Sequence, residues 1–326
     1  MTVAPKVLAV GDRADRMVSS GAIISSDDGL TWSSATDLFP VRAKALGISV
    51  GSTRTFIIGE NGFISSSANL INWTSEKIQE GWYQPFGIAS SDDLYLIAGQ
   101  YKFPETTDNP YQYNQYDETA VIMCNLSDNT SWLSIYFHPI INSRFYNIRF
   151  FTELSIFVAV GSANNTPFGV YSLDYGSSWM LIEFPTDLNI KHAYDITVTD
   201  VNSEIKFFIS VNGMILSTPS LVTPTWTISR SFIPTYGKDD FVKIASNPAG
   251  HIVAVSSGGI AYTRDQLAWD FLEQPGYRFK SVTWFNNRWI VGAESNLTQY
   301  TNWISADTVN WDPDYCGIQI YDFAIK

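Results

Sequence analysis

The sequence predicts an all-β fold, a seven-bladed β-propeller whose ring is closed by pairing the C-terminal strand with the N-terminal blade. Three observations predict it: a tryptophan that recurs at the end of a turn, four short apolar runs per repeat, and a chain that starts and stops inside a repeat. The recurring tryptophans are Trp32, Trp73, Trp132, Trp179, Trp226, Trp269 and Trp311. Their spacing is 41, 59, 47, 47, 43 and 42 residues. A period of roughly 40 to 50 residues with four strands per unit is typical of propeller blades.

Runs of β-branched and aromatic residues bounded by Gly, Asn and Ser predict the strands of each repeat. Second strands are expected at 7–11, 55–59, 94–99, 156–161, 206–211, 251–255 and 288–292. Third strands are expected at 21–24, 62–64, 120–123, 169–171, 213–216, 259–262 and 298–300. First strands are expected at 45–48, 85–89, 146–150, 194–198, 241–245 and 280–284.

The two ends of the chain predict how the ring closes. The run 7–11 is a second strand with no first strand before it, and the run 318–325 is a first strand with no repeat after it. Pairing these runs completes a seventh four-stranded blade and removes an open edge. We therefore expect residues 1–326 to form a single domain, with one insertion loop at 101–118.

Composition agrees with a β fold and excludes several classes of partner. The chain has 326 residues with 21 glycines and 14 prolines, and its net charge is −12. An acidic protein repels phosphate backbones, so we expect no nucleic acid partner. The first residues lack a secretion signal, and no apolar run reaches the roughly 18 residues that cross a bilayer. We expect a chain made in the cytoplasm, with no membrane insertion and with Cys124 and Cys316 reduced.

Two turns reach their tryptophan through the same phrase, S-x-D-x-G-x-x-W. Its residues are Ser25, Asp27, Gly29 and Trp32 in one turn, and Ser172, Asp174, Gly176 and Trp179 in the other. The aspartate can accept hydrogen bonds from the backbone of the turn, and the glycine supplies a positive φ. The tryptophan is expected to pack against the neighbouring blade. The other five turns match the phrase only in part, and those before Trp73 and Trp226 lack the aspartate.

These residues resemble the Asp-box (bacterial neuraminidase repeat-like) propellers. The resemblance covers essentially the whole chain as a period, and two of the seven turns match the box in full. It implies that the box is a folding device on the hairpin between third and fourth strands, opposite the usual binding face. Such propellers occur in sialidases, xyloglucan hydrolases, sorting receptors, a photosystem assembly factor and phage particle proteins. The phage proteins also share the phrase F-x-A-V-G before a box, as at 157–161.

One face of the predicted propeller carries the candidate partner-binding residues, because loops after second strands and links between blades share that face. The insertion there holds four tyrosines, which suit contact with sugar or protein; the alternative is a loop that folds over its own propeller. The segment 12–16 could pair internally, which we favour, or meet an acidic partner. The candidate partner-binding residues are Tyr101, Asp108, Tyr111, Tyr113, Tyr116, Asp117, Arg13 and Arg16.

The sequence offers little catalytic chemistry. A sialidase would need three arginines around the substrate, and only Arg149 sits centrally in a first strand. The carboxylates Asp195, Asp239, Asp240 and Asp322 lie on or beside first strands and leave a glycosidase open. Histidines and cysteines are dispersed, so we expect no metal site and no cofactor.

Three functions follow from these features. The first is a non-enzymatic interaction or structural propeller, a phage virion component whose partners are other virion proteins or a host-surface glycan or protein. The second is a carbohydrate-active enzyme of the glycoside hydrolase or sialidase type. The third is an assembly factor similar to the photosystem propeller.

Overall fold

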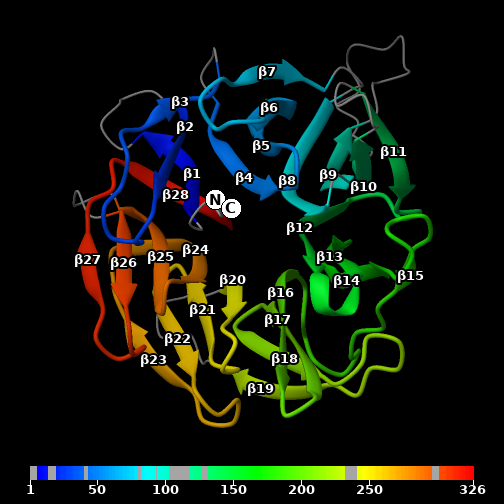
Figure 1. The fold of residues 1–326 in the computed structure, drawn as a ribbon. Coiled ribbons are helices and arrows are strands. Elements are labelled where there is room, and N and C mark those ends of the chain that lie inside the picture. The colour runs from blue at the N-terminus through cyan, green and yellow to red at the C-terminus, as the bar shows by residue number, and fades with distance from the viewer. Residues whose placement is uncertain are drawn as a thin grey trace, which may run out of the picture.

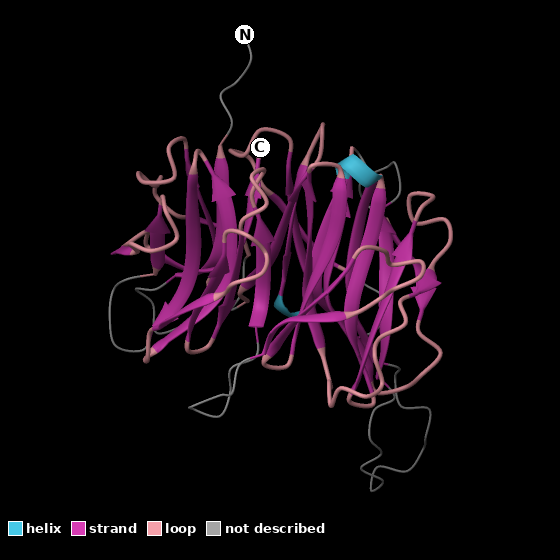
Figure 2. Ribbon diagram, turned by 90° about the horizontal axis from the view of Figure 1, so that it is seen from below, coloured by secondary structure: helices cyan, strands magenta, loops and turns pink. Residues whose placement is uncertain are grey.

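The computed structural model describes residues 6–13, 20–39, 43–78, 82–92, 94–102, 118–125, 131–231, 241–295 and 301–326. Seven antiparallel sheets of four strands surround a common axis, so the predicted seven-bladed propeller is confirmed (Figure 1). Figure 2 shows the strands running between the two faces of the ring. We number the blades in chain order and give each blade's strands from the axis outward.

Blade 1 contains β28 (Ile318–Ile325), β1 (Val7–Arg13), β2 (Gly21–Ser26) and β3 (Thr36–Asp37). Blade 2 contains β4 (Ala45–Val50), β5 (Thr55–Gly59), β6 (Phe63–Ser67) and β7 (Thr74–Lys77). Blade 3 contains β8 (Trp82–Ser91), β9 (Leu94–Lys102), β10 (Glu118–Asn125) and β11 (Trp132–Phe137). Blade 4 contains β12 (Ser143–Phe151), β13 (Ile156–Ala163), β14 (Thr166–Ser172) and β15 (Met180–Leu181).

Blade 5 contains β16 (Ala193–Val201), β17 (Glu204–Val211), β18 (Met214–Thr218) and β19 (Thr227–Ser231). Blade 6 contains β20 (Phe241–Ser246), β21 (Ile252–Ser256), β22 (Gly259–Thr263) and β23 (Asp270–Glu273). Blade 7 contains β24 (Tyr277–Phe285), β25 (Arg288–Ser295), β26 (Asn302–Ser305) and β27 (Asp312–Asp314). Two short 3-10 turns, η1 (Glu60–Gly62) and η2 (Thr152–Leu154), complete the described elements.

The C-terminal strand closes the ring in the predicted way. Strand β28 pairs antiparallel with β1, from Val7 opposite Ile325 to Arg13 opposite Ile318. Beyond the strands, Lys6 and Lys326 exchange two backbone hydrogen bonds of 2.9 and 2.8 Å. The blue and red strands therefore lie side by side in Figure 1 although they are the two ends of the chain.

The apolar interior is divided into clusters that lie between blades. Each of the seven clusters found among the described residues combines side chains of two consecutive blades. Each also contains one of the recurring tryptophans, which packs against the preceding blade as expected. Trp132 of blade 3 meets Phe56 of blade 2 edge-on, with ring centroids 5.7 Å apart. Trp226 stacks on Phe184, which follows β15, at 5.3 Å. The tryptophans therefore join neighbouring blades.

The predicted register of the first S-x-D turn is wrong by one residue. Asp28, and not Asp27, accepts the backbone N–H groups of Leu30 and Thr31, at 2.8 and 2.7 Å. Ser26, and not Ser25, accepts the N–H of Gly29 at 2.8 Å. Asp27 points to solvent and pairs with Lys6. The reason is the length of the turn. Ser26 precedes Trp32 by six residues, whereas Ser172 precedes Trp179 by seven.

The same turn recurs where the sequence pattern misses it. In blade 2, Ser67 and Asn69 take the roles of Ser26 and Asp28, so an amide replaces the aspartate before Trp73. In blades 6 and 7 the pairs Thr263–Asp265 and Ser305–Asp307 do the same. The next residue has a positive φ in all four turns: Gly29 at 77°, Leu70 at 63°, Gln266 at 63° and Thr308 at 66°.

The longer turn in blade 4 has the predicted hydrogen bonds. Ser172 Oγ accepts the N–H of Gly176 at 2.7 Å, and Asp174 accepts the N–H of Ser178 at 2.8 Å. Both Tyr175 and Gly176 have positive φ, which accommodates the extra residue.

Several strand boundaries differ from the predicted ones, and two of the differences concern the insertion in blade 3 and the third strand of blade 7. The insertion expected at 101–118 is shorter, because β9 continues to Lys102 and β10 begins at Glu118. The third strand of blade 7, expected at 298–300, is β26 (Asn302–Ser305), and residues 296–300 lie outside the described part of the chain.

Candidate functional site on the inner strands

All seven inner strands carry a β-bulge at the same place. In each, one residue near the start of the strand has no partner in the second strand of the blade. These residues are Tyr321, Leu46, Phe86, Tyr146, Tyr194, Val242 and Lys280. A bulge bends the strand and redirects one side chain. We call these seven residues the axial rim.

The axial rim is partly exposed on one face of the propeller. All seven of its residues are half-buried, and the residue before each of them is buried. The inner strands of blades 2 to 7 begin where the chain arrives from the preceding blade. The rim therefore lies on the face of the inter-blade links and the loops after second strands, the face that the sequence analysis assigned to partners.

Aromatic rings gather on the rim between blades 3 and 5. The Tyr146 ring lies 5.0 Å from Tyr194 and 6.4 Å from Phe86. The Tyr146 hydroxyl is 3.2 Å from His192 Nδ1, and the Arg144 guanidinium lies 5.6 Å from the centroid of the Tyr146 ring. Tyrosine offers a rigid apolar area with a polar tip, so this cluster can contact a ligand through both surfaces.

The opposite side of the rim is more polar. Lys44 Nζ lies 5.5 Å from the centroid of the Tyr321 ring, and Lys280 Nζ lies 3.6 Å from Glu294. Burial and then the Glu294 charge raise the pKa of Tyr321, so its hydroxyl stays neutral and can donate a hydrogen bond.

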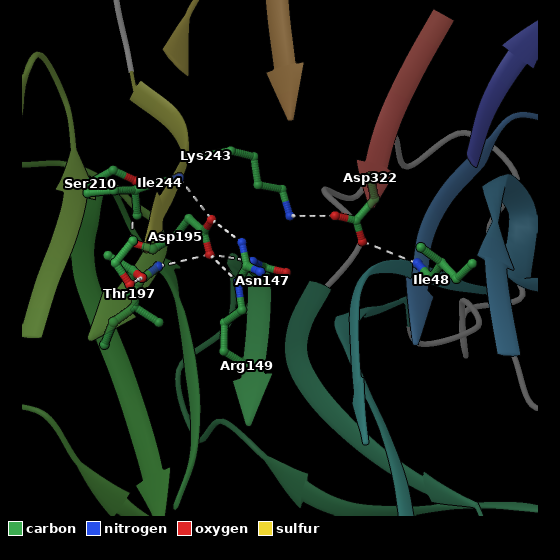
Figure 3. A network of polar contacts seen from close by, with 11 residues as sticks. Ile48, Asn147, Arg149, Asp195, Thr197, Ser210, Lys243, Ile244 and Asp322 are labelled. Atoms are coloured by element: carbon green, nitrogen blue, oxygen red, sulfur yellow. Dashed lines mark hydrogen bonds and ion pairs between the residues drawn. The ribbon is translucent and has the colours of Figure 1, made fainter. Parts of the chain in front are cut away.

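A layer of charged and small residues follows directly after the bulges. Its members are Asp322, Gly47, Gly87, Asn147, Asp195, Lys243 and Ser281. Asp195 is fully buried and is drawn left of the centre of Figure 3. Its carboxylate accepts two hydrogen bonds from Arg149, at 3.0 and 2.7 Å, and another from Asn147.

Backbone donors complete the environment of Asp195. The N–H groups of Ile196 and Ile244 donate to its carboxylate at 2.9 and 3.1 Å. Burial alone would raise the pKa of Asp195, but the charges of Arg149 and Lys243 outweigh it and hold the pKa below its usual range. Burial would likewise lower the pKa of Arg149, and Asp195 instead raises it. Both groups stay ionised and bind each other.

Asp322 connects the two sides of the ring (Figure 3). One carboxylate oxygen accepts the N–H of Ile48 at 3.2 Å, and the other lies 3.9 Å from Lys243 Nζ. Lys243 belongs to blade 6 and Asp322 to blade 1, so their contact passes over blade 7. The inner carboxylates therefore join blades to one another, and the carboxylate oxygens of Asp195 are all engaged in hydrogen bonds.

An acid or base catalyst needs a carboxyl that is free to exchange a proton with substrate.

The structure places two of the predicted partner-binding residues. Tyr101 lies inside β9, and its ring meets Phe137 edge-on at 6.2 Å. Arg13 Nε donates to Asp37 at 2.6 Å and Arg13 Nη2 donates to the Ala35 carbonyl at 2.7 Å, so this one residue of the segment 12–16 pairs inside the protein. Asp108, Tyr111, Tyr113, Tyr116, Asp117 and Arg16 lie outside the described residues, as do Asp239 and Asp240.

Sequence reasoning missed the axial rim. A bulge is a mismatch of register between two strands, and neither strand shows it alone. One signal is present in the sequence: β4, β16 and β20 each begin with two apolar residues in a row, Ala45–Leu46, Ala193–Tyr194 and Phe241–Val242, where strict alternation places a polar one.

Among the residues that the structure describes, no group of three or more His, Cys, Asp or Glu side chains could hold a metal ion. Cys124 and Cys316 are free thiols. No helix in the described ranges is long and apolar enough to span a membrane.

Comparisons with known proteins show the fold. No protein-family model and no curated protein matches the sequence. The periplasmic gluconolactonase PpgL of Pseudomonas aeruginosa superposes with a TM-score of 0.67 at 8% identity, covering 98% of this chain and 99% of that chain. YCF48 from Cyanidioschyzon merolae gives 0.59 at 11% identity, covering 91% and 94%. YCF48 bound to D1 peptide gives 0.58 at 12% identity, covering 85% and 82%. At these identities the likeness establishes the propeller fold alone.

Proposed function

We propose that this propeller is a non-catalytic binding protein that engages a segment of a partner protein at the axial rim. The observation that carries the proposal is the contrast between two adjacent layers of the inner strands. The rim exposes part of one side chain from each blade; four of the seven are aromatic, two are aliphatic and one is a lysine. In the layer below, Asp195 is held by five hydrogen bonds and Asp322 by a backbone N–H and a lysine.

The chemistry of the rim suits an extended polypeptide. Tyr146 and Tyr194 present flat surface at low conformational cost, and interface anchors are enriched in tyrosine. Their hydroxyls and His192 supply polar contacts for a peptide backbone. The rim residues come from all seven blades, so a segment that crosses the axis can touch several of them. The likeness to a propeller solved with a bound peptide supports this choice.

The finer proposal is that the chain is an Asp-box propeller of a phage particle, whose partners are other virion proteins or a host-surface glycan or protein. Its support is the turn phrase before Trp32 and Trp179 and the F-x-A-V-G phrase at 157–161. Mass spectrometry of particles made from the genome that encodes the chain tests it. Presence of the chain at fixed copy number supports a structural component, and its absence from purified particles rejects the placement.

The main proposal is tested by screening the full chain for peptide binding and for enzymatic turnover. A displayed library of random 15-residue peptides tests binding, and panels of glycosides and sugar lactones test turnover. We expect the library to yield peptides that bind with micromolar dissociation constants and the panels to show no turnover. Turnover that Asp195→Asn or Asp322→Asn abolishes would establish an enzyme and reject the proposal. A library that yields no binder would reject a peptide site.

The tyrosine-rich insertion belongs to the same proposal, because it leaves and re-enters blade 3 on the face of the rim. Replacing residues 103–117 with a short Gly/Ser link removes Tyr111, Tyr113 and Tyr116 and keeps both strands, with Tyr101 in β9. We expect unchanged melting with weaker binding of the selected peptides. Unchanged binding would remove the insertion from the partner surface.

A further inference from the structure

The outer strands of the seven blades differ in one respect. An exposed strand edge can pair with another chain, and proteins prevent this with short strands, charges or proline. Six outer strands have such a feature. Strands β3 and β15 are short, with two residues each. The other four contain charged residues: Glu76 and Lys77 in β7, Arg230 in β19, Asp270 and Glu273 in β23, and Asp312 and Asp314 in β27, which also contains Pro313.

Strand β11 of blade 3 has none of these features. It is six residues long, with the sequence WLSIYF, and no strand among the described residues pairs with its outer side. Leu133, Ile135 and Phe137 are 49%, 38% and 47% exposed. Ile140 and Ile141 continue the apolar surface and are also exposed. Exposed apolar surface next to an open strand edge is typical of an interface.

The charge pattern indicates what covers this edge. The chain has a net charge of −12, so copies of it repel each other over most of their surfaces. Residues 131–143 contain no Asp, Glu, Lys or Arg. His138, which follows the strand, has its pKa lowered by burial and stays neutral. A twofold contact places identical groups near each other, and an uncharged strip along this edge makes that arrangement free of charge repulsion.

We propose that two copies of this chain pair antiparallel through β11, joining both copies of blade 3 into one eight-stranded sheet. The pairing supplies backbone partners to both open edges and buries Leu133, Ile135 and Phe137 of each copy. Strand β11 forms the outer wall of blade 3, away from the axis in Figure 1, so both axial rims stay open. The proposal is therefore independent of the one for the rim.

The test is the molar mass of the full-length protein, measured by light scattering from about 1 to 100 µM, a range that detects micromolar association. We expect the wild-type chain to approach the mass of a dimer at the upper end. Leu133→Lys and Ile135→Lys each place like charges near the twofold axis, and we expect dissociation constants at least tenfold higher. Ile228→Lys is the matched control, because Ile228 is 48% exposed on β19, the outer strand of blade 5.

Melting temperatures show that each variant is folded, and the control is expected to dimerise like the wild type. A wild-type chain that stays monomeric over the whole range would overturn the proposal. A dimer that resists both β11 substitutions, or that Ile228→Lys dissociates equally, would place the contact elsewhere and overturn it too.

Discussion

A serine or threonine and a short acceptor two residues later build the same turn in four blades, and the acceptor is Asp28, Asn69, Asp265 or Asp307. In blade 1 the sequence offers two neighbouring aspartates, and a pattern anchored on the tryptophan selects the wrong one. Hydrogen-bond geometry separates them, since Asp28 accepts the N–H groups of the turn and Asp27 pairs with Lys6 at the surface. Exposed ion pairs of that kind contribute little to stability.

Asp28→Ala should destabilise the protein by about 1 kcal/mol, because two backbone N–H groups lose their acceptor, as at a helix cap. Asp27→Ala should leave stability within about 0.5 kcal/mol of the wild type. Urea unfolding of both variants measures the difference. Equal effects would mean that the turn does not depend on Asp28.

The pH dependence of stability should show the same hydrogen bonds to Asp28. The N–H groups of Thr31 and Leu30 lower the pKa of Asp28 to about 2 from its usual 3.8. A lowered folded-state pKa means that the contribution is complete above about pH 4 and is lost as pH falls toward 2. Asp28→Asn keeps the acceptor oxygen, as Asn69 does, and removes this titration. We expect its melting temperature to fall less than that of the wild type between pH 5 and pH 2.5.

Gly29 has a second role besides its φ of 77°. A Cβ atom there would lie 2.9 Å from Ile290 of blade 7, whereas one at Gly317, with φ 86°, would meet nothing within 4 Å. Gly317→Ala should therefore cost about 1 kcal/mol from backbone strain alone, and Gly29→Ala should cost more because the Ile290 side chain must also move. Chemical denaturation compares them. A smaller loss for Gly29→Ala would show that the turn is not packed tightly against blade 7.

At the scale of elements, the strands could be predicted and their register could not. Runs such as 7–11 and 156–161 contain enough β-branched and aromatic residues to identify strands, and these lie within β1 and β13. The third strand of blade 7 is β26 and not 298–300, and the sequence does not separate the two segments because each holds an aromatic residue among polar ones. The bulges that form the axial rim depend on two strands together, so a pattern in one strand does not predict them.

The bulges also bring Asp195 of β16 onto Arg149 of β12 and the N–H of Ile244 in β20, which joins blades 4, 5 and 6. Asp195→Ala leaves a partly buried guanidinium without its partner, and we expect a loss of about 3 kcal/mol or more. Asp195→Asn keeps one acceptor oxygen and should lose less. Thermal and urea unfolding measure both. A neutral Asp195→Ala would show that the network does not hold the blades together.

At the scale of the molecule, closure makes the seven blades equivalent, since each contacts two neighbours through its own apolar cluster. Deleting residues 318–326 removes the inner strand of blade 1 and leaves β1 with an open edge. We expect the shortened chain to aggregate, or to melt far below the full-length chain in a thermal scan. The Gly/Ser replacement of 103–117 is the control, because it removes more residues without opening the ring. An unshifted melt of the shortened chain would contradict closure by β28.

Each of the seven blades contributes one partly exposed residue to the axial rim, where we propose that the partner binds. The most direct measurement is the affinity of a selected peptide for three tyrosine variants, each checked for an unchanged melting temperature. Tyr146 and Tyr194 lie on the rim, and Tyr175 lies in a turn at the opposite end of blade 4, where it is 51% exposed. We expect Tyr146→Ala and Tyr194→Ala to weaken binding at least about tenfold and Tyr175→Ala to leave it unchanged. Equal affinity of all three variants for the peptide, or a loss confined to Tyr175→Ala, would contradict a partner site on the rim.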